Sequence, residues 1–104
     1  MMKPYLIQTT TNNYKEAKKI AKVLLEKRLG ACIQISKIDS LYMWKGELCE
    51  DKEYLLNIKT KKSNYEKIQR KIKENHSYDV PEIIAFPIKK TEKKYKKFIK
   101  DNTQ

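Results

Sequence analysis

The sequence predicts an α+β fold, with elements in the order β-α-β-β-α-β followed by a short C-terminal helix. Two observations carry this prediction. Apolar stripes at helical spacing alternate with β-branched runs, and two long extended segments flank a Lys45-Gly46 turn. The 104 residues fit one domain, which we expect to span residues 1–104.

The first strand and helix are expected within residues 5–30. Residues 5–10 form a β-branched run typical of a strand. Asn13, with Glu16 three residues later, resembles a capping box, which satisfies free backbone N–H groups at a helix start. Gly30 suits the left-handed residue that ends a helix. Between them runs one apolar helical stripe of Ala17, Ile20, Ala21, Leu24 and Leu25.

Residues 31–44 and 47–60 are predicted to form a long central hairpin. With a two-residue loop at Lys45-Gly46, opposite residues have numbers that sum to 91. Ile33 then faces Ile58 on one side of the sheet, a cross-strand match expected of a correct register. The alternative is a bulge between residues 36 and 40, which would shift the half of the hairpin nearer the helices.

The second half of the chain repeats the alternation of helix and strand. Ser63 with Glu66 resembles a second capping box. A helical stripe of Tyr65, Ile68 and Ile72 follows. Residues 83–88 then form an apolar strand, and Tyr95, Phe98 and Ile99 mark a final short helix. This order is the ferredoxin-like split βαβ arrangement, with an antiparallel sheet.

The hairpin is too long for its own domain. Arms of about 14 residues at roughly 3.3 Å each span about 46 Å, whereas a compact domain of this size has a diameter of roughly 33 Å. The tip, with Tyr42, Met43 and Trp44, should therefore project into solvent, where exposed apolar side chains and unpaired strand edges are unfavourable. We expect a partner chain to cover it, and hence an oligomer.

The composition narrows the classes of partner. The chain has 24 Lys and Arg against 13 Asp and Glu, which makes nucleic acid the first partner to consider. However, Arg28 and Arg70 are the only arginines, and lysines on solvent-facing helix positions indicate a solvated surface. No segment has the length of a membrane span or a signal-peptide core. We therefore expect a cytoplasmic protein that does not bind membranes.

The two cysteines are predicted to be reduced. The register places Cys49 opposite Tyr42 and Cys32 opposite Lys59, so the thiols lie several residues apart along the sheet. Two cysteines without a C-x-x-C pair are also too few for a disulfide framework.

Four stretches together resemble the CutA-type divalent-cation tolerance proteins over nearly the full chain. They are "KVLLEKRLGAC" (residues 22–32), "SLYMWKGE" (40–47), "YLLNIKT" (54–60) and "HSYDVPEIIAFPI" (76–88). The resemblance implies a homotrimer whose hairpins wrap onto neighbouring subunits, and a role in tolerance of copper and other divalent cations. It attaches no firm enzymatic reaction. The scaffold is similar to that of the PII signalling proteins, which bind small ligands between subunits.

His76, the only histidine, is the candidate metal ligand that the resemblance implies, with Cu(II) or another divalent cation as the possible cofactor. Asn75 stands where some relatives have a second histidine, and a single imidazole makes a poor site by itself. The alternative is a partly exposed loop residue after a helix.

Tyr78 and Glu82 lie beside Pro81, which fixes the start of the apolar strand. An unpaired carboxylate at Glu82 would be costly there, so we expect a lysine or tyrosine partner such as Lys59 or Tyr42. With Trp44, these residues form either a ligand cleft between subunits or a structural ion pair.

We expect no catalysis. The chain has no G-x-S-x-G elbow or glycine-rich phosphate loop, and neither cysteine has the surroundings of an activated nucleophile. The leading hypothesis is a homotrimer that binds a divalent metal or small ligand between subunits. The alternatives are a trimeric scaffold for a protein partner and a basic nucleic-acid-binding module of the RRM kind.

Overall fold

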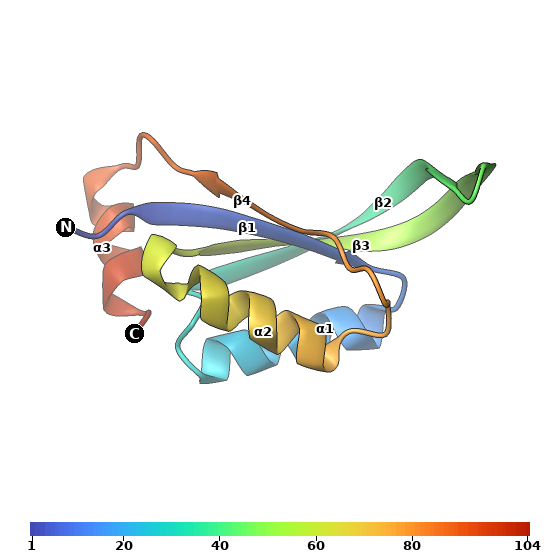
Figure 1. The fold of residues 1–104 in the computed structure, drawn as a ribbon. Coiled ribbons are helices and arrows are strands. Elements are labelled where there is room, and N and C mark those ends of the chain that lie inside the picture. Colours follow the sequence, from blue (N-terminus) through green and yellow to red (C-terminus); the bar gives the residue numbers. More distant parts are fainter.

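The computed structural model describes all 104 residues as one antiparallel four-stranded sheet with helices (Figure 1). The element order is the predicted one: β1 (Pro4–Thr11), α1 (Tyr14–Glu26), β2 (Cys32–Trp44), β3 (Glu47–Lys61), a 3-10 turn (Lys62–Asn64), α2 (Tyr65–Asn75), β4 (Ile83–Pro87) and α3 (Lys93–Asp101). The strands lie in the order β2-β3-β1-β4, so the two strands at the centre of the sheet are β1 and β3.

Two helices cover one face of the sheet. Figure 1 shows α1 and α2 side by side below the strands, while α3 and both termini lie at the end opposite the hairpin tip. The core between helices and sheet contains Ile7, Ala17, Ile20, Ala21, Leu24, Leu29, Leu56, Ile58, Ile68 and Ile72. Leu25, at the edge of the predicted stripe, is exposed instead. None of the helices has the length and apolarity needed to cross a membrane.

The other face of the sheet is not covered by α1 and α2. Gln8 of β1 donates to Asn57 of β3 across this face, and polar and aliphatic side chains dominate the central strands there. The aromatic side chains on this side belong to the edge strands, with Phe86 on β4 and Tyr42 and Trp44 on the projecting part of β2. The stacked aromatics that an RRM-like module carries on its two central strands are therefore not part of this surface.

The hairpin has the predicted register over its whole length. Cys32 pairs with Lys59 and Trp44 pairs with Glu47, so every pair of opposite residues sums to 91 and no bulge interrupts the ladder. Lys45 and Gly46 both have positive φ, 50° and 80°, as a type I′ turn requires. The shape of the molecule follows from this hairpin, since the longest of its extents, 45 × 25 × 21 Å, runs along the strands.

The end of α1 differs from the prediction. The left-handed residue is Arg28, with φ of 56°, and not Gly30. Leu29 N donates to the Leu24 carbonyl and Arg28 N to the Leu25 carbonyl, which is the Schellman pattern, and burial of Leu24 and Leu29 completes it. Gly30 serves close packing instead, because an added Cβ would lie 3.2 Å from Cγ2 of Ile58.

The predicted capping box at the start of α2 is wrong. Ser63 lies within the 3-10 turn, and Asn64 is the residue at the helix cap, without a capping hydrogen bond from its side chain. The Asn64 side chain is buried and donates to the Leu29 carbonyl at 3.3 Å, which joins this turn to the end of α1. A tertiary contact has replaced the local one.

Candidate functional site

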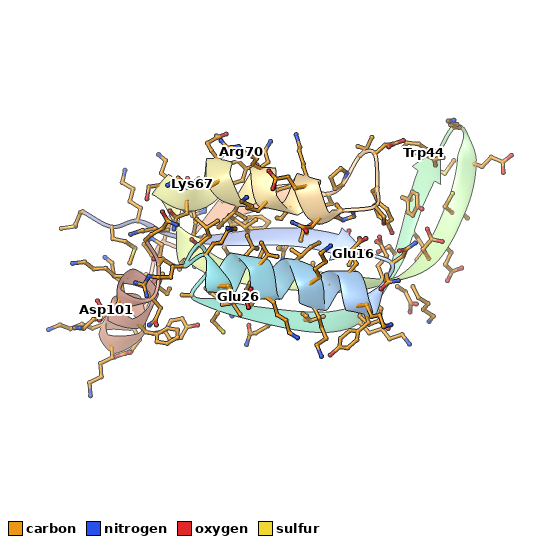
Figure 2. The ribbon with its side chains drawn as sticks, turned by 90° about the horizontal axis from the view of Figure 1, so that it is seen from below. Glu16, Glu26, Trp44, Lys67, Arg70 and Asp101 are labelled. Atoms are coloured by element: carbon orange, nitrogen blue, oxygen red, sulfur yellow. The ribbon has the colours of Figure 1, made fainter.

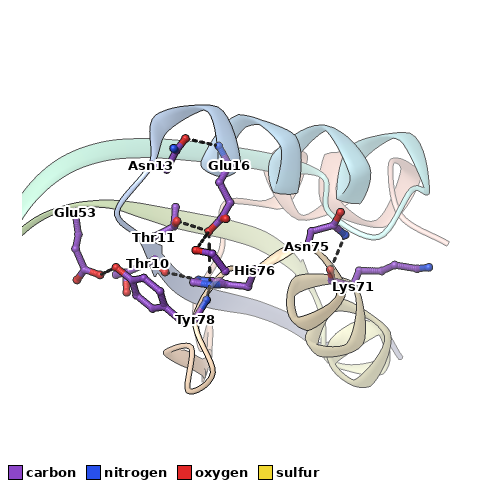
Figure 3. Close-up of polar contacts among 10 residues, drawn as sticks. Thr10, Thr11, Asn13, Glu16, Glu53, Lys71, Asn75, His76 and Tyr78 are labelled. Carbon is purple, nitrogen blue, oxygen red and sulfur yellow. Dashed lines mark hydrogen bonds and ion pairs between the residues drawn. The ribbon is translucent and has the colours of Figure 1, made fainter. Parts of the chain in front are cut away.

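The His76 side chain is buried at the point where α2 ends and the chain turns toward β4 (Figure 3). Its Nε2 lies 2.7 Å from the Thr10 carbonyl oxygen, and its Nδ1 lies 3.0 Å from the backbone N of Tyr78. Because the Tyr78 N–H must donate, Nδ1 is the acceptor, and the Nε2–H group donates to the Thr10 carbonyl oxygen. Both ring nitrogens of the neutral imidazole are thus used within the chain.

These contacts constrain the metal hypothesis. A metal at His76 would have to displace either Thr10 from Nε2 or the Tyr78 amide from Nδ1, since coordination needs a free nitrogen lone pair. The chain has no group of three or more His, Cys, Asp and Glu side chains arranged to hold a metal ion. The alternative, a partly exposed loop residue after a helix, holds for the residue, which follows α2 and is half-buried, but its imidazole is fully buried. Metal binding by His76 stays a prediction.

Glu16 connects three segments around this histidine. Its backbone N donates to Asn13 Oδ1 at 3.0 Å, so one half of the predicted capping box is present. Its carboxylate does not return to Asn13; it accepts from Thr11 Oγ1 at 2.5 Å and Ser77 Oγ at 3.3 Å, and lies 3.6 Å from His76 Nδ1. Burial alone would raise the pKa of Glu16, but the hydrogen bonds from Thr11 and Ser77 outweigh it and lower the pKa.

This network positions Tyr78 against the hairpin. The His76 and Tyr78 rings pack with their centroids 4.7 Å apart, and the Tyr78 hydroxyl donates to Glu53 of β3 at 2.8 Å. Glu53 is only 7% exposed. Burial, followed by the hydrogen bond to Glu53, raises the pKa of Tyr78 well above its ordinary value. Figure 3 shows the Tyr78 ring reaching from the loop toward the strand that carries Glu53.

A second tyrosine on the hairpin has a similar arrangement. The Tyr42 hydroxyl of β2 donates to the Asp51 carboxylate of β3, and this hydrogen bond raises the pKa of Tyr42 to about 12. Two hydroxyl–carboxylate pairs, from Tyr42 and from Tyr78, therefore lie on the same stretch of the hairpin.

A cleft of about 360 Å³ opens between the hairpin and the loop before β4, lined by Tyr42, Trp44, Glu53, Tyr78, Asp79 and Val80. Three of its six lining residues are aromatic, and its polar groups are two tyrosine hydroxyls and two carboxylates. A volume and lining of this kind suit a small ligand. Lys45, at the turn, has its Nζ 6.0 Å from the centroid of the Trp44 ring.

Two of the four predicted cleft residues line this cleft. Trp44 and Tyr78 do, but Lys59 lies six residues from Glu53 along β3, roughly 20 Å away, where it donates to Gln34. Glu82 is exposed and has no hydrogen bond or ion pair, so the expected pairing with Lys59 or Tyr42 is not present within one chain. The extended strand β3 keeps Lys59 away from the cleft of its own chain.

Glu53 is the residue that sequence reasoning missed. Its one signal was its place in the register, on the same side of β3 as Asp51 and toward the loop that follows α2. The cysteines match their prediction, since Cys32 and Cys49 are both free thiols opposite Lys59 and Tyr42.

Comparison with known proteins gives the family. Residues 5–102 match the family described as CutA1 divalent ion tolerance protein. This chain belongs to the CutA1 family. The divalent-cation tolerance protein CutA of Thermus thermophilus is 38% identical over 99 residues, covering 94% of this chain and 96% of the relative. Protein CutA 1, chloroplastic, of Oryza sativa is 38% identical over 100 residues, covering 95% of this chain and 56% of the relative.

Solved CutA structures have the same fold. The structure of the periplasmic divalent cation tolerance protein CutA from Archaeoglobus fulgidus superposes on this chain with a TM-score of 0.95 at 33% sequence identity. It covers 97% of this chain, and 99% of that protein is matched. The family resemblance deduced from the four sequence stretches is confirmed.

Proposed function

We propose that this CutA1 family member is a non-catalytic homotrimer that binds a divalent cation or a small ligand in clefts between its subunits. The observation that carries the proposal is the hairpin tip. Leu41, Met43, Trp44 and Leu48 are each more than half exposed, although they are large and apolar. Exposed apolar side chains clustered on one projecting ribbon mark an interaction surface.

The sheet supports the same conclusion. Ile84 and Phe86 of β4 are 42% and 46% exposed on the face that α1 and α2 do not cover. The hairpin tip and this open face give each subunit two apolar surfaces that a second copy can bury. The cleft of Tyr42, Trp44 and Tyr78 lies between the projecting part of the hairpin and the loop before β4, where a neighbour would close it.

The oligomeric state tests the assembly. Light scattering coupled to gel filtration should give a mass three times the 12.4 kDa of one chain at micromolar concentration. A mass of one chain under these conditions would contradict the proposal.

Calorimetry with Cu(II) tests the metal. His76→Gln is the sharper variant, because a glutamine amide can still donate to the Thr10 carbonyl while it offers no imidazole nitrogen. Heats that are lost in this variant would make His76 the ligand, whereas equal heats would exclude it. The trimer should persist in both proteins.

The absence of catalysis and the cytoplasmic location are also parts of this proposal. The family name describes tolerance of divalent ions and no reaction. Relatives include a protein named as chloroplastic and one named as periplasmic, so location varies between members.

A further inference from the structure

The cleft beside the hairpin has an unusual combination of walls for so basic a protein. Three aromatic side chains, from Tyr42, Trp44 and Tyr78, share it with the carboxylates of Glu53 and Asp79. No lysine or arginine lines it, although the chain has 24 of these residues and a net charge of +11. The cleft is therefore both apolar and negative.

The carboxylate of Glu53 lacks a cation. The three lysine–carboxylate ion pairs of the chain join Lys52 to Asp39, Lys71 to Glu74 and Lys97 to Asp101. Glu53 is 7% exposed and accepts a hydrogen bond from Tyr78 but has no positive partner. Buried carboxylates are normally paired with a cation, because burial of an isolated charge is costly. The carboxylate of Glu53 is thus open to a cation from outside the chain.

The aromatic walls indicate which kind of cation. The face of an indole or phenol ring attracts an ammonium group, and such rings together form cages for organic cations. The Lys45 ammonium near the Trp44 ring is an instance of this contact within the chain. Within one chain, no three His, Cys, Asp or Glu side chains converge as a divalent-metal site requires, so the residues that one chain places in the cleft suit an organic cation better than a metal.

We propose that the cleft binds an alkylammonium group, with its methylene stem against Trp44 and Val80 and its charge beside Glu53 and Asp79. This inference rests on the proposed function, because it names the ligand class of the same cleft. The alkylammonium can belong to a free diamine or polyamine, or to a lysine side chain of a neighbouring copy. The recognising chemistry is the same in both cases.

Trp44 is the only tryptophan, so its fluorescence reports directly on the cleft. We would titrate the full-length protein with 1,4-diaminobutane at constant ionic strength, with butane-1,4-diol as a neutral control of equal length. The expected result is a saturable change with the diamine and none with the diol. Glu53→Gln, which can still accept from Tyr78, should weaken binding about tenfold or more.

Two further variants complete the design. Asp79→Asn changes an exposed carboxylate of the cleft and carries little risk for folding, and it should weaken binding in the same direction as Glu53→Gln. Glu26→Gln removes an exposed carboxylate from α1, away from the cleft, and should leave the titration unchanged.

A second measurement, of assembly by light scattering, identifies the source of the cation. If a neighbour's lysine fills the cleft, added diamine produces no change. Glu53→Gln and Asp79→Asn then weaken the assembly in light scattering, while Glu26→Gln does not. Either pattern supports the inference. Equal binding of diol and diamine overturns the inference. So does a Cu(II) titration of Trp44 that saturates while Glu53→Gln changes neither diamine binding nor assembly.

Light scattering on the same samples keeps the two proposals separate. If the protein is a trimer and Glu53→Gln matches Glu26→Gln both in the diamine titration and in mass, only the alkylammonium site is contradicted. A monomer that binds the diamine contradicts the trimer alone.

Discussion

The two halves of β3 differ in what covers them. Leu56 lies in the half beneath α1 and α2 and is fully buried, whereas Leu48, eight residues earlier and on the same side of the strand, is 71% exposed. Backbone pairing is the same in both halves, since the register with β2 is uninterrupted. Figure 2 shows the contrast, with Trp44 on the part of the hairpin that projects beyond α1 and α2. Hydrogen bonding therefore builds the hairpin, and only packing distinguishes its halves.

The largest expected difference in stability comes from shortening a leucine to alanine in each half of β3. Leu56→Ala should lower the free energy of unfolding by about 3 kcal/mol, because it leaves a cavity in the core. Leu48→Ala should change the stability of an isolated chain by less than about 0.5 kcal/mol. Chemical denaturation over a range of protein concentrations measures both. In a trimer, Leu48→Ala should weaken the dependence of stability on concentration. A large loss that is independent of concentration would mean that Leu48 packs within its own subunit.

A smaller change in stability is expected at Glu16, which connects the loop after α2 to the helix-covered half of the sheet. Glu16→Gln should cost about 1–2 kcal/mol at neutral pH, because the carboxylate accepts from Thr11 and Ser77. The folded state lowers the pKa of Glu16 below its ordinary 4.5. Its stabilisation is thus complete above that value and is lost as the pH falls through the lowered pKa.

Denaturation curves of the wild type and of Glu16→Gln should therefore converge in acid. Glu26→Gln, on the exposed side of α1, is the matched control and should follow the wild type at every pH. A constant gap between the wild type and Glu16→Gln down to the most acid pH would show that charge has no part in this network.

At the Lys45-Gly46 turn, Gly46→Ala should lower the free energy of unfolding by about 1 kcal/mol. Gly46→Ala places a side chain at φ of 80°, which is unfavourable although nothing lies within 4 Å of the added Cβ. Lys45→Asn should be neutral or slightly stabilising, since asparagine favours the first position of this turn. Thermal unfolding measures both changes. A destabilisation of several kcal/mol by Gly46→Ala would indicate that a partner packs against the turn.

The smallest effect is expected between the two halves. Lys52 and Asp39 form an exposed ion pair at 2.6 Å across the hairpin, with side chains 72% and 56% accessible. Such pairs contribute little, so Lys52→Ala should change stability by less than about 0.5 kcal/mol. A double-mutant cycle with Asp39→Ala gives the coupling. A coupling well above 1 kcal/mol would mean that assembly buries the pair.

Sequence reasoning predicted the fold well because local chemistry and register determine it. Lys45-Gly46 fixed the turn, and the apolar match of Ile33 with Ile58 fixed the pairing of the strands. It placed the end of α1 wrongly because Arg28 adopts the left-handed conformation that glycine favours, held there by hydrogen bonds of the Schellman pattern.

The candidate site was predicted only in part. Trp44 and Tyr78 could be found from their segments, but Glu53 acquires its partner from a loop 25 residues away in sequence. Side-chain contacts between distant segments, such as Tyr78 with Glu53 or Asn64 with Leu29, depend on tertiary packing that no local pattern encodes. The prediction for Lys59 failed because the hairpin register places it away from the cleft, opposite Cys32.

The central claim is that sister chains bury the hairpin tip. Acrylamide quenching of Trp44 emission tests it most directly, with the unfolded chain as the reference for full accessibility. At micromolar concentration the indole should be markedly shielded, and the shielding should be lost on dilution as the mass falls to 12.4 kDa. An indole as accessible at high concentration as the half-exposed ring of a single chain would contradict the account.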